Sequence, residues 1–209
     1  MKLKNVLIRQ QILDAARQEF LDKGFRDASL RSIAAKANGT TGMIYTYFKN
    51  KNQIFQVLIQ PLLDRFEQRL DDDAHPLNRP LNQALHSSNM TPELWFTRNF
   101  RFLMDLVAAH PREMRLLFLK ADGSAFQDYE QTLIRRGTQR SVAAFRELKR
   151  NPAFEGETLS EFFVQTLVQY VISATREIVK QEKSKDDIRI YEKEITAFLF
   201  SGWKALVQF

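Results

Sequence analysis

The chain has 209 residues, of which 44% are hydrophobic and 27% are charged, and its formal net charge is +6. This composition is typical of a soluble globular protein, and no apolar run approaches the roughly 18 residues that span a bilayer. The absence of cysteine excludes disulfides and thiolate metal sites, and with the lack of a signal-peptide pattern it leads us to expect a cytoplasmic protein.

Residues 3–23 form the first predicted helix, because their apolar positions recur with helical spacing. Gly24 and the apolar Phe25 follow with the pattern of a Schellman-type helix end, in which a left-handed glycine stops the helix. The stripe that this helix should turn toward the core consists of Ile12, Leu13, Ala16 and Phe20.

Residues 30–48 are predicted to form two short amphipathic helices joined by a tight corner. The inner face of the second helix holds Ile44 and Phe48, and its outer face holds Thr41 and Tyr45. A helix with an apolar inner face and an outer row of hydroxyl and aromatic groups is suited to lie in a DNA major groove.

Hydroxyl and amide side chains stand where helix caps are needed. Ser29 precedes the second helix and Thr40 precedes the third, and each can accept a backbone N–H of the first turn. Asn50 and Gln53 have the spacing of a capping box for a fourth helix. Pro61 lies within this fourth helix, which it should kink or break.

The excess of positive charge lies in the first quarter of the chain. Residues 1–52 hold ten Lys and Arg residues against four acidic residues. Since the whole chain has 31 basic and 25 acidic residues, the remainder has 21 of each. Clustered basic charge indicates a polyanionic partner, although an excess of this size also occurs as ordinary surface variation.

The rest of the chain is also predicted to be helical, without a β-pattern or an internal repeat. Residues 71–92 are polar and are predicted to form a loop with at most a short helix. Further helices should start where the sequence has helix-start signals, which are capping residues, proline in the first turn, or a Glu or Gln three residues after the cap. These signals are Thr91 with Pro92, His110 with Pro111, Ser124 with Gln127, Thr158 with Glu161, and Asp186 or Asp187.

The last two predicted helices are apolar over much of their circumference, so each has two sides to bury. Pairing with the same two helices of a second copy, around a two-fold axis, would cover the second side. Other helices of the same chain could also cover it. The residues expected at the interface between copies are Val168, Ile172, Phe198, Trp203 and Leu206.

The segment from residue 8 to residue 55 resembles the TetR family of bacterial transcriptional regulators. The resemblance lies in ILDAARQEFLDKGF, SLRSIAAKA and TTGMIYTYFKNK, whose aromatic ending and Lys-x-Lys are typical of the family. The family usually has Gly then Val at the corner, where this chain has Asn38 and Gly39. Asparagine tolerates the left-handed conformation, but the loss of valine removes a core contact.

The resemblance implies an all-α protein with an N-terminal three-helix helix-turn-helix domain for DNA binding (residues 1–50). A larger helical domain for effector binding and dimerisation follows (residues 51–209). It also implies a homodimer that represses transcription from an operator in double-stranded DNA until a small apolar or amphipathic effector binds. Half-sites should then lie about 34–36 Å apart. The alternative is a DNA-binding protein without an effector, whose second domain binds a protein partner.

The resemblance also indicates which residues should lie at the DNA. Arg31 can reach a guanine edge or a phosphate, and Thr41 can contact a base edge or a thymine methyl group. Gly42 would let the third helix approach the DNA closely. Thr40 should place the first amides of that helix near a phosphate, or it could act only as a cap.

Three further residues are expected at the phosphate backbone. Tyr45 and Tyr47 can bind phosphate oxygens through their hydroxyl groups while their rings pack on the domain, and Tyr47 could instead be a core residue. Lys51 lies in the first turn of the fourth helix, where the family contacts the backbone. Because the helix dipole disfavours a lysine there, a phosphate is expected to offset the cost.

Aromatic residues of the second domain could line an effector pocket, or they could form an ordinary packed core. The histidines lack the spacing of metal ligands, so no metal or other cofactor is expected. No nucleophile–base pair or phosphate-binding loop is visible, so the chain is not expected to be an enzyme. The residues proposed for the pocket are Trp95, Phe96, Asn99, Phe100, Phe118, Phe126, Phe163, Thr166 and Tyr170.

Overall fold

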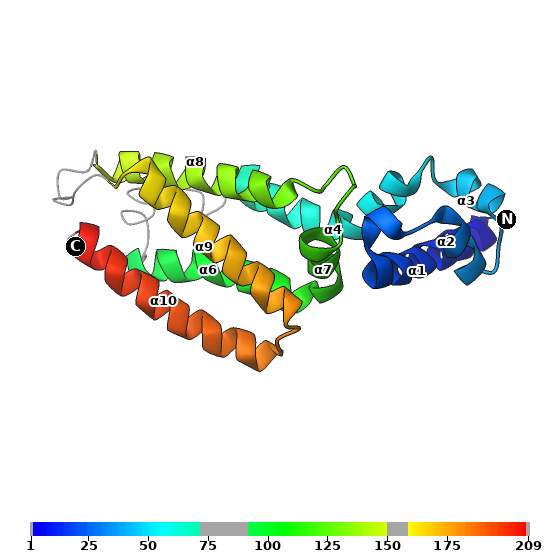
Figure 1. Ribbon diagram of the computed structural model, residues 1–209. Helices are drawn as coiled ribbons and strands as arrows, with labels where there is room; N and C mark the ends of the chain where they lie inside the picture. The colour runs from blue at the N-terminus through cyan, green and yellow to red at the C-terminus, as the bar shows by residue number, and fades with distance from the viewer. Residues whose placement is uncertain (1, 72–91, 150–158, 208–209) are drawn as a thin grey trace. The chain divides into compact units, whose positions relative to one another are not determined.

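A computed structural model describes residues 2–71, 92–149 and 159–207 (Figure 1). The regular structure of these residues is helical, without a strand among them, as expected for an all-α protein. The chain divides into two compact units, one of Met1–Asp64 with His110–Tyr129 and one of Arg65–Ala109 with Glu130–Phe209. The functional division expected after residue 50 rests on a different criterion and stays a prediction.

The first unit has a closely packed apolar centre. The stripe predicted for the first helix, which includes Ile12 and Phe20, is buried. The ring of Phe20 lies 5.7 Å from that of Phe25 and 5.2 Å from that of Phe55, and the rings of Phe25 and Phe55 are 5.3 Å apart. The helices of this unit are α1 (Lys2–Asp27), α2 (Leu30–Lys36), α3 (Thr41–Tyr47), the first part of α4 (Lys51–Asp71) and α7 (Pro111–Leu119).

Helix α1 is interrupted at Gly24, where φ is 79° and ψ is 167°. The positive φ is the conformation that glycine allows, but the extended ψ turns the chain away from the helix. The N–H of Phe25 therefore donates to the carbonyl of Lys120, at 2.8 Å, instead of to a carbonyl of α1. The predicted Schellman-type ending is wrong in its hydrogen bonds, although the chain does break at this glycine.

Three of the predicted caps are present. Ser29 Oγ accepts the N–H of Ser32 at 3.1 Å, and Thr40 Oγ1 accepts the N–H of Met43 at 3.2 Å. Asn50 Oδ1 accepts the N–H of Gln53 at 2.9 Å. The side chain of Gln53 bonds the N–H of residue 49 rather than that of Asn50, so the capping box is only half formed. Helix α4 continues through Pro61 without the predicted break.

The segment after α7 forms a turn rather than the start of the next helix. Ser124 Oγ accepts the N–H of Phe126 at 3.0 Å, and Gln127 Oε1 accepts the N–H of Gly123 at 3.2 Å. Because these groups close a turn, α8 begins only at Tyr129, and the predicted start at Ser124 is wrong.

The second unit contains the rest of α4, α6 (Pro92–Ala109), α8 (Tyr129–Lys149), α9 (Glu161–Lys180) and α10 (Lys185–Val207). Helix α6 lies along α10 and also contacts α9 (Figure 1). The cap of α9 is Ser160, whose Oγ accepts the N–H of Phe163, whereas the predicted Thr158 lies outside the described residues. The cap of α10 is Ser184, whose Oγ accepts the N–H of Asp187 at 3.1 Å, so the aspartate is its partner and not the cap.

Ion pairs join α6 to α10 around a buried carboxylate. Glu192 accepts from Arg101 and from Arg189 at 2.6 Å each, and Arg189 also pairs with Asp105 at 2.6 Å. Burial alone would raise the pKa of Glu192, but the hydrogen bonds from the two arginines hold that pKa below its ordinary value. None of the described helices combines the length and the apolarity that crossing a membrane requires.

Candidate nucleic-acid interface

Helix α3 separates an apolar inner face from a polar outer face, as predicted. Ile44 is fully buried and Phe48 is 2% exposed. The side chain of Tyr45 is 58% exposed, Gly42 is exposed and Thr41 is half-buried. The outer face of α3 therefore carries the hydroxyl of Thr41, the phenol ring of Tyr45 and, between them, Gly42, which has no side chain. This face is accessible to a ligand in the described structure.

Thr46, which was not among the predicted site residues, is exposed one turn after Gly42. Its Oγ1 donates to the carbonyl of Gly42 at 3.3 Å, so the hydroxyl is oriented along the outer face of α3. Residues four apart lie on the same face of a helix, so the position of Thr46 relative to Gly42 could have indicated that Thr46 lies on the outer face.

Four of the described cations between residues 5 and 52 form ion pairs. Arg17 bonds Asp14 at 2.8 Å and Arg26 bonds Asp122 at 2.8 Å. The remaining pairs are Lys23 with Glu19, Lys36 with Glu19 and Lys36 with Asp22. These pairs neutralise positive charge on α1 and at the end of α2.

Between residues 5 and 52 of the described structure, the side chains of two exposed cations lack ion-pair, hydrogen-bond and aromatic partners. Among the side chains described between residues 5 and 52, those of Arg31 and Lys49 make no ion pair or hydrogen bond. Arg31 lies on α2, the helix before α3, and Lys49 follows Phe48, the cap residue of α3, so uncommitted positive charge lies on both sides of α3 in the sequence. Arg9 has a different partner, because its guanidinium lies 5.2 Å from the centre of the Phe48 ring.

Tyr47 joins the end of α3 to the beginning of α1. Its ring is half-buried, and its hydroxyl donates to Asn5 Oδ1 at 3.4 Å. The first turns of α1 therefore lie beside α3, as Figure 1 also shows. A phenol oxygen keeps lone pairs while it donates, but its proton is engaged here, so the expected phosphate contact would replace the bond to Asn5.

Lys51 occupies a different environment from the one expected. Its Nζ donates to the carbonyls of Phe25 at 2.6 Å, Ala28 at 2.8 Å and Arg26 at 3.3 Å, and it lies 4.3 Å from the centre of the Phe25 ring. Burial lowers the pKa of this ammonium group, and the nearby Asp27 opposes the shift. Since an ammonium has three protons, no N–H is left for a phosphate in this conformation.

Glu19 of α1 fixes α2 through its paired carboxylate. The side chain is fully buried, and each of its oxygens lies 2.9 Å from a lysine Nζ, one of Lys23 and one of Lys36. Burial would raise the pKa of Glu19, but hydrogen bonds from Lys23, Lys36 and Ser32 outweigh it and lower that pKa to about 2. This pairing holds the helix that precedes the corner against α1.

Glu19→Gln is expected to lower the free energy of unfolding at neutral pH by about 2 kcal/mol, because a neutral amide cannot balance two lysines. A carboxylate with a folded pKa of about 2, against 4.5 unfolded, stabilises the fold above pH 4.5. That contribution is lost as the pH falls from 4.5 toward 2. Urea unfolding at several pH values should therefore show the gap between the two proteins closing in this window.

The exposed Asp14, which accepts from Arg17 at 2.8 Å and from Gln10 at 3.0 Å, provides the control. Asp14→Asn should change stability by less than about 0.5 kcal/mol at every pH. A gap between Glu19→Gln and the parent protein that stays constant down to pH 3 would contradict the assigned role.

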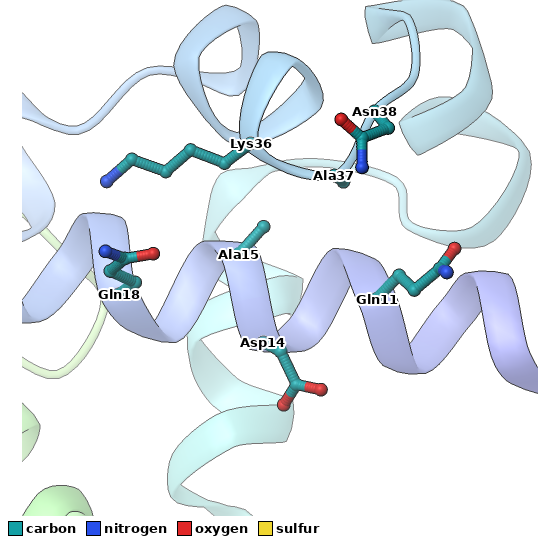
Figure 2. A pocket seen from close by; sticks show the side chains of 7 residues that line it. All are labelled: Gln11, Asp14, Ala15, Gln18, Lys36, Ala37 and Asn38. Carbon is teal, nitrogen blue, oxygen red and sulfur yellow. The ribbon is translucent and has the colours of Figure 1, made fainter.

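An open depression of about 280 Å³ lies between α1 and the corner that follows α2 (Figure 2). Ala15 and Ala37 lie where the two segments face each other, with polar side chains around them. This depression is lined by none of the aromatic residues proposed for an effector pocket. The lining residues are Gln11, Asp14, Ala15, Gln18, Lys36, Ala37 and Asn38.

The residues proposed for the effector pocket are divided between the units. Phe118 and Phe126 belong to the first unit, where Phe118 is buried and Phe126 lies 6.3 Å from Phe55. Of those in the second unit, Phe100 is buried and Phe163 is half-buried, whereas Thr166 and Tyr170 are exposed. The side chains of Trp95, Phe96 and Asn99 lie outside those described.

Tyr170 and Phe100 are both connected to Tyr191 of α10. The Phe100 and Tyr191 rings are 6.3 Å apart. Burial, with the charge and the hydrogen bond of Tyr170, raises the pKa of Tyr191 to about 12. This part of the proposed pocket is occupied by packed aromatic groups in the described structure.

The residues proposed for the dimer interface also differ in exposure. Phe198 is 72% exposed and Leu206 is 44% exposed. Ile172 is buried within its own unit, and Val168 faces α8, since its Cγ1 would lie 3.0 Å from a Cβ at Gly137. Their positions argue against Ile172 and Val168 as interface residues. Trp203 is outside the described side chains.

Comparisons with known proteins bear on the same segment. Residues 12–58 match the model of a family described as bacterial regulatory proteins, tetR family. The HTH-type transcriptional regulator HbdR of Aromatoleum sp. (strain CIB) is 32% identical over 79 residues, which make up 38% of this chain and 34% of that protein. The chain therefore aligns with about a third of the length of this relative.

Solved structures match over nearly the whole chain. A TetR-like transcriptional regulator from Rhodococcus sp. RHA1 has a TM-score of 0.62 at 22% identity, covering 97% of each chain. The transcriptional regulator FadR from Bacillus subtilis, in complex with stearoyl-CoA, has a TM-score of 0.62 at 18% identity, covering 92% of this chain and 98% of that one. At these identities the similarity establishes the fold.

Proposed function

We propose that this chain is a member of the tetR family of bacterial regulatory proteins, whose model matches residues 12–58, and that it is a transcriptional regulator that binds double-stranded DNA through α3. The observation that carries the proposal is the accessible outer face of α3, with the unpaired cations Arg31 and Lys49 before and after this helix in the sequence. Such a face suits a major groove, with the cations at base edges or phosphates. We assign DNA binding to residues 1–50 and propose that the protein acts in the cytoplasm.

The proposed contacts follow from the position of each side chain. Thr41 and Tyr45 read the groove, and Gly42 allows close approach. Arg31 reaches a base edge or a phosphate, and Thr40 keeps its capping role beside the backbone. Tyr47 contacts a phosphate by exchanging its bond to Asn5. Lys51, whose protons are engaged by carbonyls, is assigned to holding the helices together.

Lys49→Ala tests the proposal without knowledge of the operator. Loss of one phosphate contact should weaken binding to a random-sequence duplex and reduce the slope of log affinity against log salt by about 1. Lys193→Ala, which removes an exposed lysine from the second unit, should leave both quantities unchanged. Identical salt slopes for Lys49→Ala and the parent protein would contradict the assigned face.

We further propose that residues 51–209 form a homodimer through α9 and α10. Large apolar side chains are exposed on both helices, with Phe162 78% exposed on α9 and Phe198 on α10. Phe198 and Leu206 are eight residues apart, about two helical turns, so they lie along one side of α10. A second copy related by a two-fold axis would remove this apolar surface from water.

Phe198→Glu is expected to raise the dimer dissociation constant at least 30-fold, equivalent to about 2 kcal/mol, because two buried carboxylates would face the axis. Sedimentation velocity over a concentration series measures the change. Val6→Glu, at a residue of the first unit that is 64% exposed, should leave the association unchanged. A monomeric parent protein, or equal dissociation constants, would contradict the interface.

We propose in addition that a small apolar or amphipathic effector binds residues 51–209 and relieves repression. Two observations support this proposal: the second unit is rich in aromatic residues, and the regulator FadR from Bacillus subtilis, which has a similar fold, was solved in complex with stearoyl-CoA. The effector would bias the spacing of the two DNA-binding units, as a shift of population. Titrating long-chain acyl-CoA against coenzyme A alone, with release of bound DNA as the signal, tests this step. Unchanged DNA binding in both titrations would favour the alternative of a protein partner.

A further inference from the structure

The corner between α2 and α3 contains a glycine that the backbone does not require. The left-handed conformation of this corner belongs to Asn38, whose φ is 52°. Among the described glycines, positive φ values occur at Gly24 and Gly123, and not at Gly39. An L-residue could therefore adopt the backbone conformation of Gly39, so its lack of a side chain needs another explanation.

The explanation is the side chain of Met43, which folds back over Gly39. A Cβ placed on Gly39 would overlap Met43 Cε and would lie 2.7 Å from its Sδ. The backbone of Met43 is fixed by the bond from its N–H to Thr40 Oγ1, and the N–H of Gly39 donates to Ala34 at 2.9 Å. Both ends of this contact are thus held by the helices that meet at the corner.

We propose that Met43 is a positioning residue whose thioether fills the corner above Gly39 and fixes the angle between α2 and α3. The inference deepens the proposed function, on which its consequence for DNA binding rests. The flexible thioether can follow an irregular space, and it substitutes for the apolar side chain that Gly39 lacks. A side chain at residue 39 and the Met43 thioether are then mutually exclusive occupants of one volume.

If the two side chains exclude each other, the double variant should recover the unfolding midpoint and the DNA affinity that the single variants lose. Met43→Ala empties the corner and should lower the unfolding midpoint by about 4 °C. Gly39→Val displaces the flexible end of the Met43 side chain and should lower the midpoint by a smaller amount, about 2 °C. The double variant places the valine in the emptied space and should melt within about 1 °C of the parent protein. Affinity for a selected DNA duplex should fall about 10-fold in each single variant and recover to within about 3-fold in the double variant.

Gly202→Ala combined with Met43→Ala provides the control pair. Gly202 belongs to the second unit, and a Cβ placed on it would meet nothing within 4 Å. The effects of these two changes on the unfolding midpoint should therefore add. Losses that also add for Gly39→Val with Met43→Ala would overturn the proposal.

The melting measurements use no DNA, which separates this inference from the proposed function. Rescue of the midpoint in a protein that binds no duplex would support the contact between Gly39 and Met43 and refute DNA binding. If the parent protein binds DNA but the double variant recovers neither the unfolding midpoint nor the affinity, the positioning role of Met43 is refuted. The proposal of DNA binding then remains intact.

Discussion

Gly42→Leu is expected to lower affinity for a selected duplex at least 100-fold, equivalent to about 2.8 kcal/mol, while it stabilises the protein. Gly42 is exposed on α3, and an added Cβ would lie 3.7 Å from Thr40 Oγ1, in ordinary contact. Leucine is a better helix former than glycine by up to about 1 kcal/mol, so the free energy of unfolding should rise. The side chain would instead occupy the space that α3 needs against the DNA.

Opposite signs of the two effects are the diagnostic feature of this prediction. Gly42→Ala should give the same gain in stability with a smaller loss of affinity, because a methyl group displaces less of the helix from the groove. Fluorescence anisotropy with a labelled duplex and urea unfolding measure the two quantities on the same samples. Full affinity in Gly42→Leu would show that another face of the unit binds DNA.

Lys51→Met is expected to lower the free energy of unfolding by about 3 kcal/mol with no DNA present. The change keeps the length of the side chain but removes the donor from the carbonyls of Phe25, Arg26 and Ala28. Hydrogen bonds to a charged group contribute about 1.5–3 kcal/mol each, and the contributions are not additive. Lys51 lies in the first turn of α4, so its loss should free the segment between α1 and α2.

Lys49→Met is the matched control, since this exposed lysine makes no contact through its described side chain. Its free energy of unfolding should stay within about 0.5 kcal/mol of that of the parent protein. If Lys51 served only as a phosphate contact, Lys51→Met would keep full stability and lose affinity for every duplex alike. Urea unfolding therefore decides between the role expected from the sequence and the role indicated by its hydrogen bonds.

Features set by a few neighbouring residues were predictable from the sequence. The caps Ser29 and Thr40 act within three residues of themselves, and the two faces of α3 follow from the helical period. The buried positions of Ile44 and Phe48 required no knowledge of the partner helix. Local chemistry is thus sufficient to identify the candidate DNA-binding helix.

Features that depend on distant contacts were not predictable in the same way. Residues 110–129 belong to the first unit because Lys120 accepts a bond from Phe25 and Asn52 accepts one from Ala125. A lysine at position 51 can reach outward to a phosphate or inward to carbonyls, and only the packed structure distinguishes the two. Such choices depend on pairs more than twenty residues apart, for which a single sequence has no pattern.

The proposed dimer surface on α9 and α10 shows the same difficulty. A helix that is apolar on two sides does not indicate which side its own chain covers. Ile172 turns toward the core of its unit, whereas Phe198 and Leu206 remain exposed. The sequence therefore indicated that a second apolar side exists, and the packing identified the residues on it.

Selection of bound duplexes from a random pool, followed by sequencing, would test directly whether α3 recognises a specific DNA sequence. If the outer face of α3 reads the major groove in a symmetric dimer, the pool should converge on an inverted repeat whose half-sites lie about one helical turn apart. The same selection with Thr41→Ala should change the preferred bases within each half-site. A pool that stays random with the parent protein, under salt conditions that suppress non-specific binding, would contradict the account.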